Sequence, residues 1–288
     1  MKKWPSLFFA TIFLTLATSF AAKATEAVRR PAKFVQPSAM SDSFPAPLMT
    51  GDRRYTVANT HSHNDYEQPT PFWTAYNAQF GSIEADIFLV NGTLYVAHDS
   101  NELRRGRTLE AYYLEPLAGQ IEKNHGHPYT DTSRQLQMLI DVKADSTAVL
   151  AALVSLLEKY PALTQTPSLI WVISGNRPAA SLYTSYPPFI AFDGILGVHY
   201  SPTALSRIVM MSDDLHSYTH WGGLDTIPPA DKKALIAAIN WSHDLHLPVR
   251  FWDAPDFPNA WDQLIRLRVD FINTDHIRQL AAYLREQH

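Results

Sequence analysis

The sequence predicts an α/β fold, a TIM-type (β/α)8 barrel that spans residues 54–288. Short apolar runs alternate with longer amphipathic runs over about 230 residues, which is typical of parallel strands joined by helices. The alternation gives close to eight strand–helix units, as this barrel requires. A doubly wound open sheet is the alternative, but the sequence has no glycine-rich dinucleotide-binding loop to support it.

The strands are predicted from short runs of aliphatic, β-branched and aromatic residues. In chain order they are Tyr55–Asn59, Ser82–Phe88, Leu94–Ala97, Leu136–Val142, Leu169–Ile173, Gly194–Val198, Ile208–Met211, Val249–Trp252 and Phe271–Asn273. Helices are predicted where apolar residues recur at helical spacing between the later strands. They are Ala148–Lys159, Asp231–Leu245, Asn259–Leu267 and His276–Glu286.

The N-terminal region predicts export. Residues 1–24 have the pattern of a signal peptide, because two lysines precede an apolar stretch that ends in the cleavage pattern Ala22-Lys23-Ala24. We therefore expect a periplasmic or secreted protein without a stable membrane span after cleavage; a retained membrane anchor is the competing interpretation. Residues 25–53 are rich in Pro, Ala and Ser, and we expect an extended linker or a lid.

Charge and cysteine content exclude several classes of partner and site. Removal of three lysines with the signal peptide leaves 21 of 24 Lys and Arg against 28 acids, so the formal net charge changes from −4 to −7. This acidic balance argues against nucleic acid as a partner. The absence of cysteine excludes thiolate ligands and thiol nucleophiles, so His, Asp and Glu must bind any metal. The oligomeric state is not indicated.

Ionisable residues gather between His61 and Asp99. Glu84 and Asp86 stand two residues apart in the apolar run SIEADIFLV, so both side chains point to one side of a strand. Acids in such a strand are costly to bury without a cation, and a solvated strand face is the alternative. His61 and His98 bracket the pair and are suited to general base and general acid catalysis, although a lone strand-end histidine is more often structural.

Asp141 and Lys143 close the strand in the sequence MLIDVKAD. Because the carboxyl ends of barrel strands meet at one face, we expect these residues to join the same cluster. Glu84, Asp86 and Asp141 would then offer three oxygen ligands to one divalent cation, Mg²⁺ or Ca²⁺. Lys143 would bind a phosphate oxygen or a carboxylate, and a simple salt bridge with Asp141 is the alternative.

Two further residues are weaker candidates for contacts with the substrate or its phosphate. His63 is interpreted as a substrate contact or a hydrogen-bonded turn residue rather than a metal ligand. Arg177 follows the strand at 169–173 in the sequence SGNRP and is a candidate phosphate contact; a solvated loop arginine is equally expected.

These motifs, taken in order, resemble the phosphatidylinositol-phospholipase-C-like (PLC-like) phosphodiesterases. The pattern consists of His61, IEAD at 83–86, VAHD at 96–99, IDVK at 140–143, VRFWDAPD at 249–256 and VDFINTDHI at 269–277. Glycerophosphodiester phosphodiesterases of this superfamily have His-Arg-Gly, Glu-x-Asp and His-Asp motifs in this order, and spider-venom sphingomyelinase D has the Asp-x-Lys form. The opening HSHNDY is most similar to the branch named for the yeast "altered inheritance of mitochondria" protein 6.

The resemblance covers about residues 55–285 and implies a TIM-type barrel with one bound cation. It places His61 and His98 at the acid and base positions, the three acids at the cation, and Lys143 and Trp252 against phosphate and substrate. The chain departs from the glycerophosphodiesterase pattern at three places. Ser62-His63 replaces Arg-Gly, Asp141 replaces the usual Glu, and the Glu-Asn-Thr after the first histidine is missing.

The sequence therefore predicts an exported, metal-dependent phosphoric diester hydrolase that acts on a phospholipid or glycerophosphodiester-like substrate. One alternative is a metallohydrolase of the amidohydrolase or polymerase-histidinol-phosphatase type, which would use His61-x-His63 and late ligands from Thr274-Asp275-His276. Another is a non-catalytic exported binding protein on the same barrel. The substrate alcohol, the choice between hydrolysis and a cyclic phosphate, and the assignment of acid and base are left open.

Overall fold

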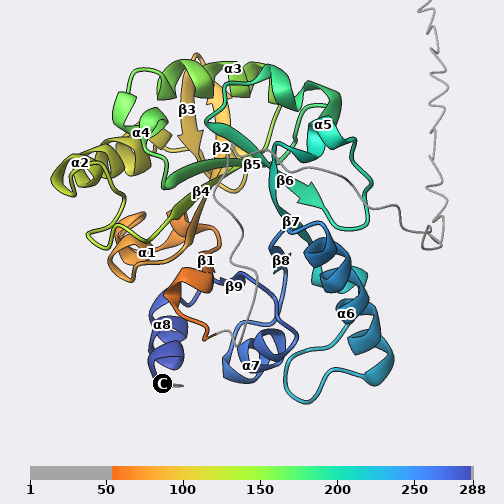
Figure 1. Cartoon of the computed structure of the whole chain (residues 1–288). Helices are drawn as coiled ribbons and strands as arrows, with labels where there is room; N and C mark the ends of the chain where they lie inside the picture. Colours follow the sequence, from red (N-terminus) through yellow and green to blue (C-terminus); the bar gives the residue numbers. More distant parts are fainter. Residues whose placement is uncertain (1–53, 287–288) are drawn as a thin grey trace, which may run out of the picture. The chain divides into compact units, whose positions relative to one another are not determined.

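The predicted barrel is present in the computed structural model, which describes residues 54–286 (Figure 1). Eight parallel strands form its wall in the neighbour order β8-β7-β6-β5-β4-β2-β1-β9, and a parallel bridge between Arg250 and Phe271 joins β8 to β9. The strands are β1 (Thr60–Ser62), β2 (Ser82–Val90), β4 (Leu136–Val142), β5 (Leu169–Gly175), β6 (Ile190–Ile195), β7 (Ile208–Asp214), β8 (Val249–Trp252) and β9 (Ile272–Thr274). The predicted signal peptide, residues 1–24, and the segment 25–53 lie outside the described residues.

Helices lie around the outside of this wall and connect the strands (Figure 1). They are α1 (Trp73–Asn77), α2 (Glu115–Lys123), α3 (Ser146–Leu157), α4 (Pro161–Gln165), α5 (Pro202–Leu205), α6 (Pro229–Asp244), α7 (Pro258–Arg266) and α8 (Ile277–Glu286). Each of the four predicted helices is found within two residues at both ends. Among the described residues, no helix has the length and apolar character needed to cross a membrane.

Three strand predictions are corrected by the structure. The first strand begins at Thr60 rather than Tyr55, because Thr56 and Asn59 cap a short 3-10 helix at Val57–Asn59. β6 covers Ile190–Ile195 instead of Gly194–Val198, and Gly197 lies in the turn beyond it with φ of 76°. The strand predicted at 94–97 is β3 (Thr93–Val96), but it pairs antiparallel with β2 as a hairpin and is not part of the barrel wall.

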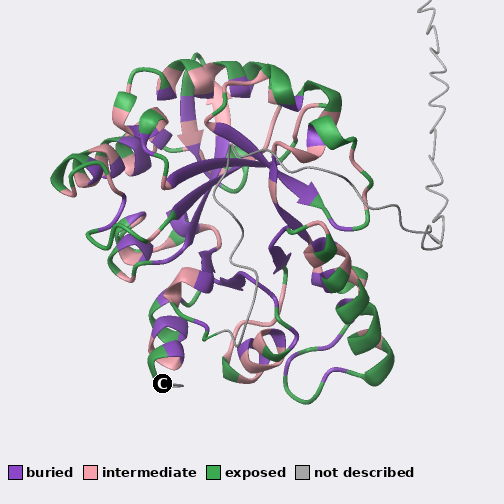
Figure 2. Cartoon of the chain, viewed as in Figure 1, coloured by how far each residue is buried: buried purple, intermediate pink, exposed green. Residues whose placement is uncertain are grey.

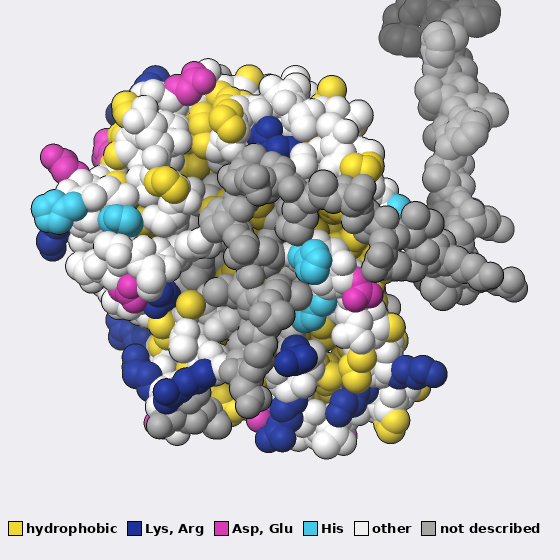
Figure 3. Space-filling view, in the orientation of Figure 1, with side chains coloured by type: hydrophobic (Ala, Val, Ile, Leu, Met, Phe, Trp, Pro, Cys, Tyr) yellow, Lys and Arg dark blue, Asp and Glu magenta, His cyan; other side chains and the backbone are white. Residues whose placement is uncertain are grey.

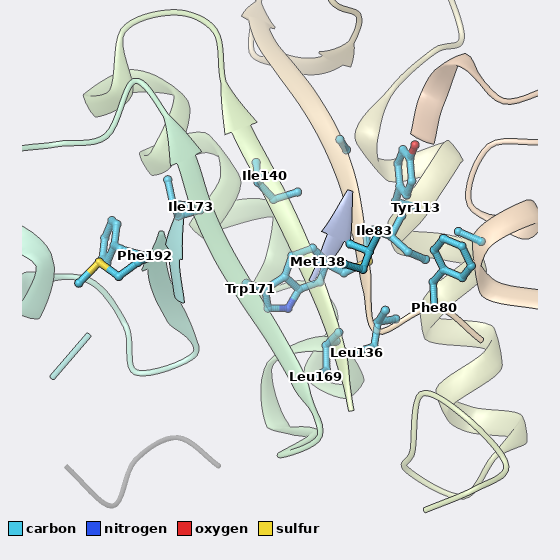
Figure 4. Close-up of a cluster of buried hydrophobic side chains, with 14 of the residues drawn as sticks. Phe80, Ile83, Tyr113, Leu136, Met138, Ile140, Leu169, Trp171, Ile173 and Phe192 are labelled. Atoms are coloured by element: carbon cyan, nitrogen blue, oxygen red, sulfur yellow. The ribbon is translucent and has the colours of Figure 1, made fainter. Parts of the chain in front are cut away.

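Alternation along the strands produces two apolar layers. Outward side chains of β2, β4, β5 and β6 pack against the helices, as Figure 4 shows for residues that include Ile83, Met138, Trp171 and Phe192. A smaller inward cluster fills the barrel and consists of Leu139, Ile170, Val172, Ala191, Met210 and Phe271. The wall is accordingly buried on both faces, while the helices expose their outer sides (Figure 2). The face in Figure 3 shows apolar and charged side chains intermixed.

Toward the carboxyl ends of the strands, the inward positions change from apolar to polar. The strands contribute buried or half-buried polar side chains there, namely His61, Glu84, Asp86, Asp141, Ser174, Asp193, Ser212, Arg250 and Asn273. The inward apolar cluster forms a floor under this layer. The fold therefore gathers the ionisable residues of widely separated segments at one end of the barrel, as catalytic sites in this fold require.

Candidate active site

Glu84 and Asp86 on β2 form a carboxylate cluster with Asp141 near the carboxyl end of β4. One carboxylate oxygen from each residue lies within 4.8 Å of the others. The parallel register explains the approach, because Asp86 and Asp141 are direct partners across β2 and β4, and Glu84 points inward from two residues earlier. The convergence predicted from the sequence spacing is thus present in the structure.

Lys143 binds the same cluster. Its Nζ lies 2.8 Å from Asp86 Oδ2 and 3.2 Å from Asp141 Oδ1. Burial and the charges of Glu84 and Asp141 raise the pKa of Asp86 to about 7, although Lys143 opposes the shift. Burial and the charge of Glu84 also raise the pKa of Asp141. The carboxylates of the cluster therefore oppose one another's ionisation.

Two features of the carboxylate cluster fit a divalent cation. Asp86 Oδ1 is buried and has no hydrogen-bond partner among the described residues, which leaves a ligand oxygen free. Gly175, at the end of β5, lies beside Asp141, and a β-carbon there would collide with Asp141 Oδ1. The strand end thus leaves room for this carboxylate. Three carboxylates with a free oxygen suit Mg²⁺ or Ca²⁺, and the residues present could hold either ion.

His61 is fully buried on β1 and is held at both ring nitrogens. Nδ1 lies 2.8 Å from Ser82 Oγ, and Nε2 lies 2.7 Å from Glu84 Oε2 and 2.6 Å from Arg250 Nη1. Burial, assisted by the positive charge of Arg250, lowers the pKa of His61 to about 4. The imidazole is consequently neutral at neutral pH, as a proton acceptor must be.

Arg250 is a site residue that the sequence reasoning missed. Its guanidinium is almost fully buried, and Nη1 also lies 3.2 Å from Glu84 Oε2 and 3.3 Å from Asn273 Oδ1. Burial alone would raise the pKa of Glu84, but the hydrogen bond with His61 and the charge of Arg250 outweigh it and hold that pKa below its ordinary value. Arg250 thus keeps Glu84 ionised inside the barrel.

Asp193 on β6 lies on the other side of Arg250 and was also missed. Its Oδ2 is 3.9 Å from Arg250 Nη2 and accepts hydrogen bonds from the hydroxyls of Ser174 and Ser212. The pair could have been recognised from the sequence, because each is a charged residue inside an otherwise apolar strand. That is the signal by which Glu84 and Asp86 were recognised.

His98 lies on the opposite side of the carboxylate cluster and is much more open. Its side chain is 54% exposed, whereas that of His61 is 0% exposed. Nδ1 lies 3.2 Å from Asp86 Oδ2 and 3.4 Å from the hydroxyl of Tyr66. The hairpin of β2 and β3 returns the chain to the barrel mouth and so places His98 beside Asp86.

His63 lies at the end of β1, where it joins the first strand to the last. Its backbone N–H donates to Thr274 O, and its Nδ1 lies 2.9 Å from Asp275 Oδ1. Burial lowers the pKa of His63, but the hydrogen bond to Asp275 and the charge of Glu84 raise it above the ordinary value overall. His276 contacts Asp256 instead of His63. These contacts favour a turn residue and give no support to the His-x-His metal site of the alternative hypothesis.

Trp252 and Arg177 lie at the mouth of the barrel outside the carboxylate cluster. Trp252 ends β8 and is 39% exposed, so its indole is accessible to a ligand. Arg177 Nη1 donates to the backbone carbonyl of Asp193. Contacts of either residue with substrate or phosphate remain predictions.

A second group of potential metal ligands lies at the ends of β7 and β8. It consists of Asp214, His216 and Asp253. His216 Nδ1 lies 3.4 Å from Asp214 Oδ1 and 3.2 Å from Asp253 Oδ2, so the imidazole contacts both carboxylates at the surface. This group is more exposed than the carboxylate cluster, and the ring centroid of His220 lies 5.8 Å from that of His216.

Comparisons with known proteins show similarity to phosphodiesterases. Residues 52–164 match the AIM6-like phosphodiesterase domain, and residues 248–277 match the glycerophosphoryl diester phosphodiesterase family. The "Altered inheritance of mitochondria protein 6 homolog" of Arthroderma benhamiae is 27% identical over 77% of this chain and 82% of its own length. The corresponding protein of Kluyveromyces lactis is 24% identical over 79% of this chain and 72% of its own length.

Solved structures with a similar fold include two glycerophosphodiester phosphodiesterases, one of them described as putative. That of Parabacteroides distasonis is 14% identical, with a TM-score of 0.48 over 79% of this chain and 97% of that protein. That of Silicibacter pomeroyi, described as putative, is 14% identical, with a TM-score of 0.49 over 79% and 92%. The two family matches support the expected resemblance: residues 52–164 are similar to the AIM6-like phosphodiesterase domain and residues 248–277 to the glycerophosphoryl diester phosphodiesterases, and both matches support a phosphoric diester hydrolase.

Proposed function

We propose that the protein hydrolyses a phosphodiester with one divalent cation, Mg²⁺ or Ca²⁺, held by Glu84, Asp86 and Asp141. The observation that carries the proposal is the carboxylate cluster with a buried, unpartnered oxygen and a histidine on each side. A bound cation would neutralise a phosphate oxygen and stabilise the charge of the transition state. Lys143 lies within reach to add a second positive charge.

The different surroundings of the two histidines support an assignment of acid and base. His61 is neutral at neutral pH, and we assign it as the base that takes the proton from the attacking hydroxyl of water or of the substrate itself. As the new P–O bond forms and the bond to the alcohol breaks, protonated His98 gives its proton to the leaving oxygen. His98 suits this role because its ring is exposed to solvent and lies beside Asp86 of the carboxylate cluster.

The substrate class and the location of the protein are finer parts of the proposal. A phospholipid or a glycerophosphodiester-like small molecule is supported by the kinship with glycerophosphodiesterases and by the accessible indole of Trp252 at the mouth. Export is supported by the basic and apolar pattern of residues 1–24.

The proposal is tested with the purified protein and a panel of substrates. Bis(p-nitrophenyl) phosphate, several phospholipids and several glycerophosphodiesters are incubated with the wild-type protein and with His61→Ala. We expect hydrolysis that EDTA abolishes, that Mg²⁺ or Ca²⁺ restores, and that the variant lacks. Activity that survives EDTA would contradict the cation. No hydrolysis above the variant on any substrate would favour the non-catalytic binding protein.

A further inference from the structure

Tyr66 joins the carboxylate cluster to the exposed histidine. Its ring is 1% exposed, and its hydroxyl lies 2.7 Å from Asp86 Oδ2 and 3.4 Å from His98 Nδ1. The same hydroxyl lies 2.9 Å from Asn64 Oδ1. A phenol in this position contacts a candidate cation ligand and a proton-transfer residue at once.

The chain around Tyr66 is built to hold the ring in place. Asn64 adopts a left-handed conformation with φ of 44°, which turns the chain back toward the barrel mouth. The adjacent Asp65 accepts three hydrogen bonds, from Ser62 Oγ, the Phe72 backbone N–H and the Tyr113 hydroxyl. On the far side, a guanidinium nitrogen of Arg107 donates to the Tyr66 carbonyl. Within the sequence HSHNDY, residues 61–65 thus form a tether that positions Tyr66.

The two oxygens of Asp86 have opposite surroundings. Oδ2 faces the Tyr66 hydroxyl, Lys143 Nζ at 2.8 Å and His98 Nδ1 at 3.2 Å. Oδ1 is equally buried but has no hydrogen-bond partner among the described residues. A carboxylate that receives all its donors on one oxygen cannot rotate without losing them, so its other oxygen keeps a constant direction.

We propose that Tyr66 is a positioning residue that holds Asp86 with Oδ1 available to the cation and links this carboxylate to His98. The inference rests on the cation site of the proposed function. Partners of metal-binding carboxylates fix the orientation of the ligand, and their loss typically costs about 10–100-fold in metal affinity or activity. No charge is added or removed by this hydroxyl, so its effect is one of geometry.

The test compares Tyr66→Phe with Tyr129→Phe. Each variant removes one buried phenol hydroxyl, but the hydroxyl of Tyr129 donates to the backbone carbonyl of Phe80 instead of Asp86. Binding of Mn²⁺, Mg²⁺ and Ca²⁺ to each protein is measured by calorimetry at pH 8, together with the melting temperature and the phosphodiesterase kcat and KM. We expect Tyr66→Phe to bind the cation about 10–100-fold more weakly and to lose kcat, while Tyr129→Phe loses thermal stability but keeps the cation affinity.

Three outcomes would overturn the inference. The first is a cation affinity of Tyr66→Phe within twofold of the wild-type value. The second is an equal weakening in both variants, since that would indicate a general packing effect. The third is a wild-type protein that binds none of the three ions, which would remove the cation site as well. A protein that binds the cation but hydrolyses no phosphodiester would contradict only the proposed function, and the calorimetry would still decide the role of Tyr66.

Discussion

The two sides of the carboxylate cluster differ in almost every physical respect. On the buried side, His61 and Glu84 share Arg250, and all three side chains are at most 5% exposed. On the open side, His98 is 54% exposed and Lys143 is 25% exposed. Each side nonetheless places one histidine within 3.2 Å of a candidate cation ligand.

The contrast supports different proton-transfer roles for the two histidines. Burial and the positive charge of Arg250 lower the pKa of His61, whereas the His98 side chain is open to solvent. Environments that differ in this way are the usual means by which a site obtains a base and an acid from the same residue type. These surroundings support the proposed assignment of His61 as the base and His98 as the acid.

The largest expected effect comes from removing each histidine in turn. With an alkyl phosphodiester, His61→Ala and His98→Ala should each lower kcat by about 10²–10⁴-fold. The leaving group of bis(p-nitrophenyl) phosphate needs no proton. With this substrate, His98→Ala should therefore regain much of the lost kcat, whereas His61→Ala should not. Steady-state rates on the two substrates measure this. Recovery by His61→Ala alone would reverse the assignment of acid and base.

The second prediction compares the two positively charged side chains of the site, Arg250 and Lys143. Arg250→Met should destabilise the fold by about 3–5 kcal/mol, because it leaves the buried acids Glu84 and Asp193 without their positive partner. Lys143→Met should cost less stability, since Lys143 is partly solvated, while still weakening phosphate binding. Denaturant unfolding of both variants gives the comparison. A greater loss of unfolding free energy for Lys143→Met than for Arg250→Met would contradict the larger contribution that we expect from the buried ion pairs.

The third prediction concerns the space between Gly175 and the carboxylate of Asp141. Gly175→Ala should weaken cation binding, because the added β-carbon would displace the carboxylate of Asp141. Gly197→Ala is the matched control, since Gly197 also has a positive φ but has open space around its α-carbon. Both variants suffer backbone strain, so only the difference between their calorimetric affinities for Mg²⁺ is informative. Equal affinities would place the cation away from Asp141.

The smallest expected effect is a pH dependence of the unfolding free energy that arises from Asp65, in the tether that precedes Tyr66. Burial raises the pKa of Asp65 from 3.8 to about 6, although three hydrogen bonds oppose the shift. Its contribution to stability is therefore complete below its ordinary pKa and is lost as the pH rises through about 6. Relative to Asp65→Asn, the wild-type protein should lose roughly 1–3 kcal/mol of unfolding free energy between pH 4 and pH 7.

Asp131→Asn serves as the control for this pH dependence. Asp131 is exposed, and the hydrogen bonds from Ser133 lower its pKa. The difference between wild type and this variant should accordingly stay constant from pH 4 to pH 7. A constant difference for Asp65→Asn as well would mean that Asp65 remains ionised throughout this range.

Much of the barrel and of the carboxylate cluster could be predicted because local patterns determine them. The strands Leu136–Val142 and Val249–Trp252 are found at their predicted bounds, since both are apolar runs between clear breaks. Glu84 and Asp86 could be recognised as inward acids from their spacing alone. The same reasoning was available for Arg250 and Asp193, whose strands are otherwise apolar.

Other parts of the fold and of the site depend on contacts between distant segments and could not be predicted from the local sequence. Tyr66 looks like an ordinary core aromatic, and only the turn at Asn64 brings its hydroxyl to Asp86. The contact of His63 with Asp275 joins residues more than two hundred positions apart in the chain. The first strand has only three residues, so a capping interaction at Thr56 was enough to shift it.

The central claim is that one cation binds between Glu84, Asp86 and Asp141. A crystal structure of the protein grown with Mn²⁺ tests it most directly, because anomalous scattering locates the ion without reference to activity. We expect an anomalous peak bound by oxygens of these three carboxylates. A peak that contacts His63 but not Glu84, or one confined to Asp214, His216 and Asp253, would contradict it.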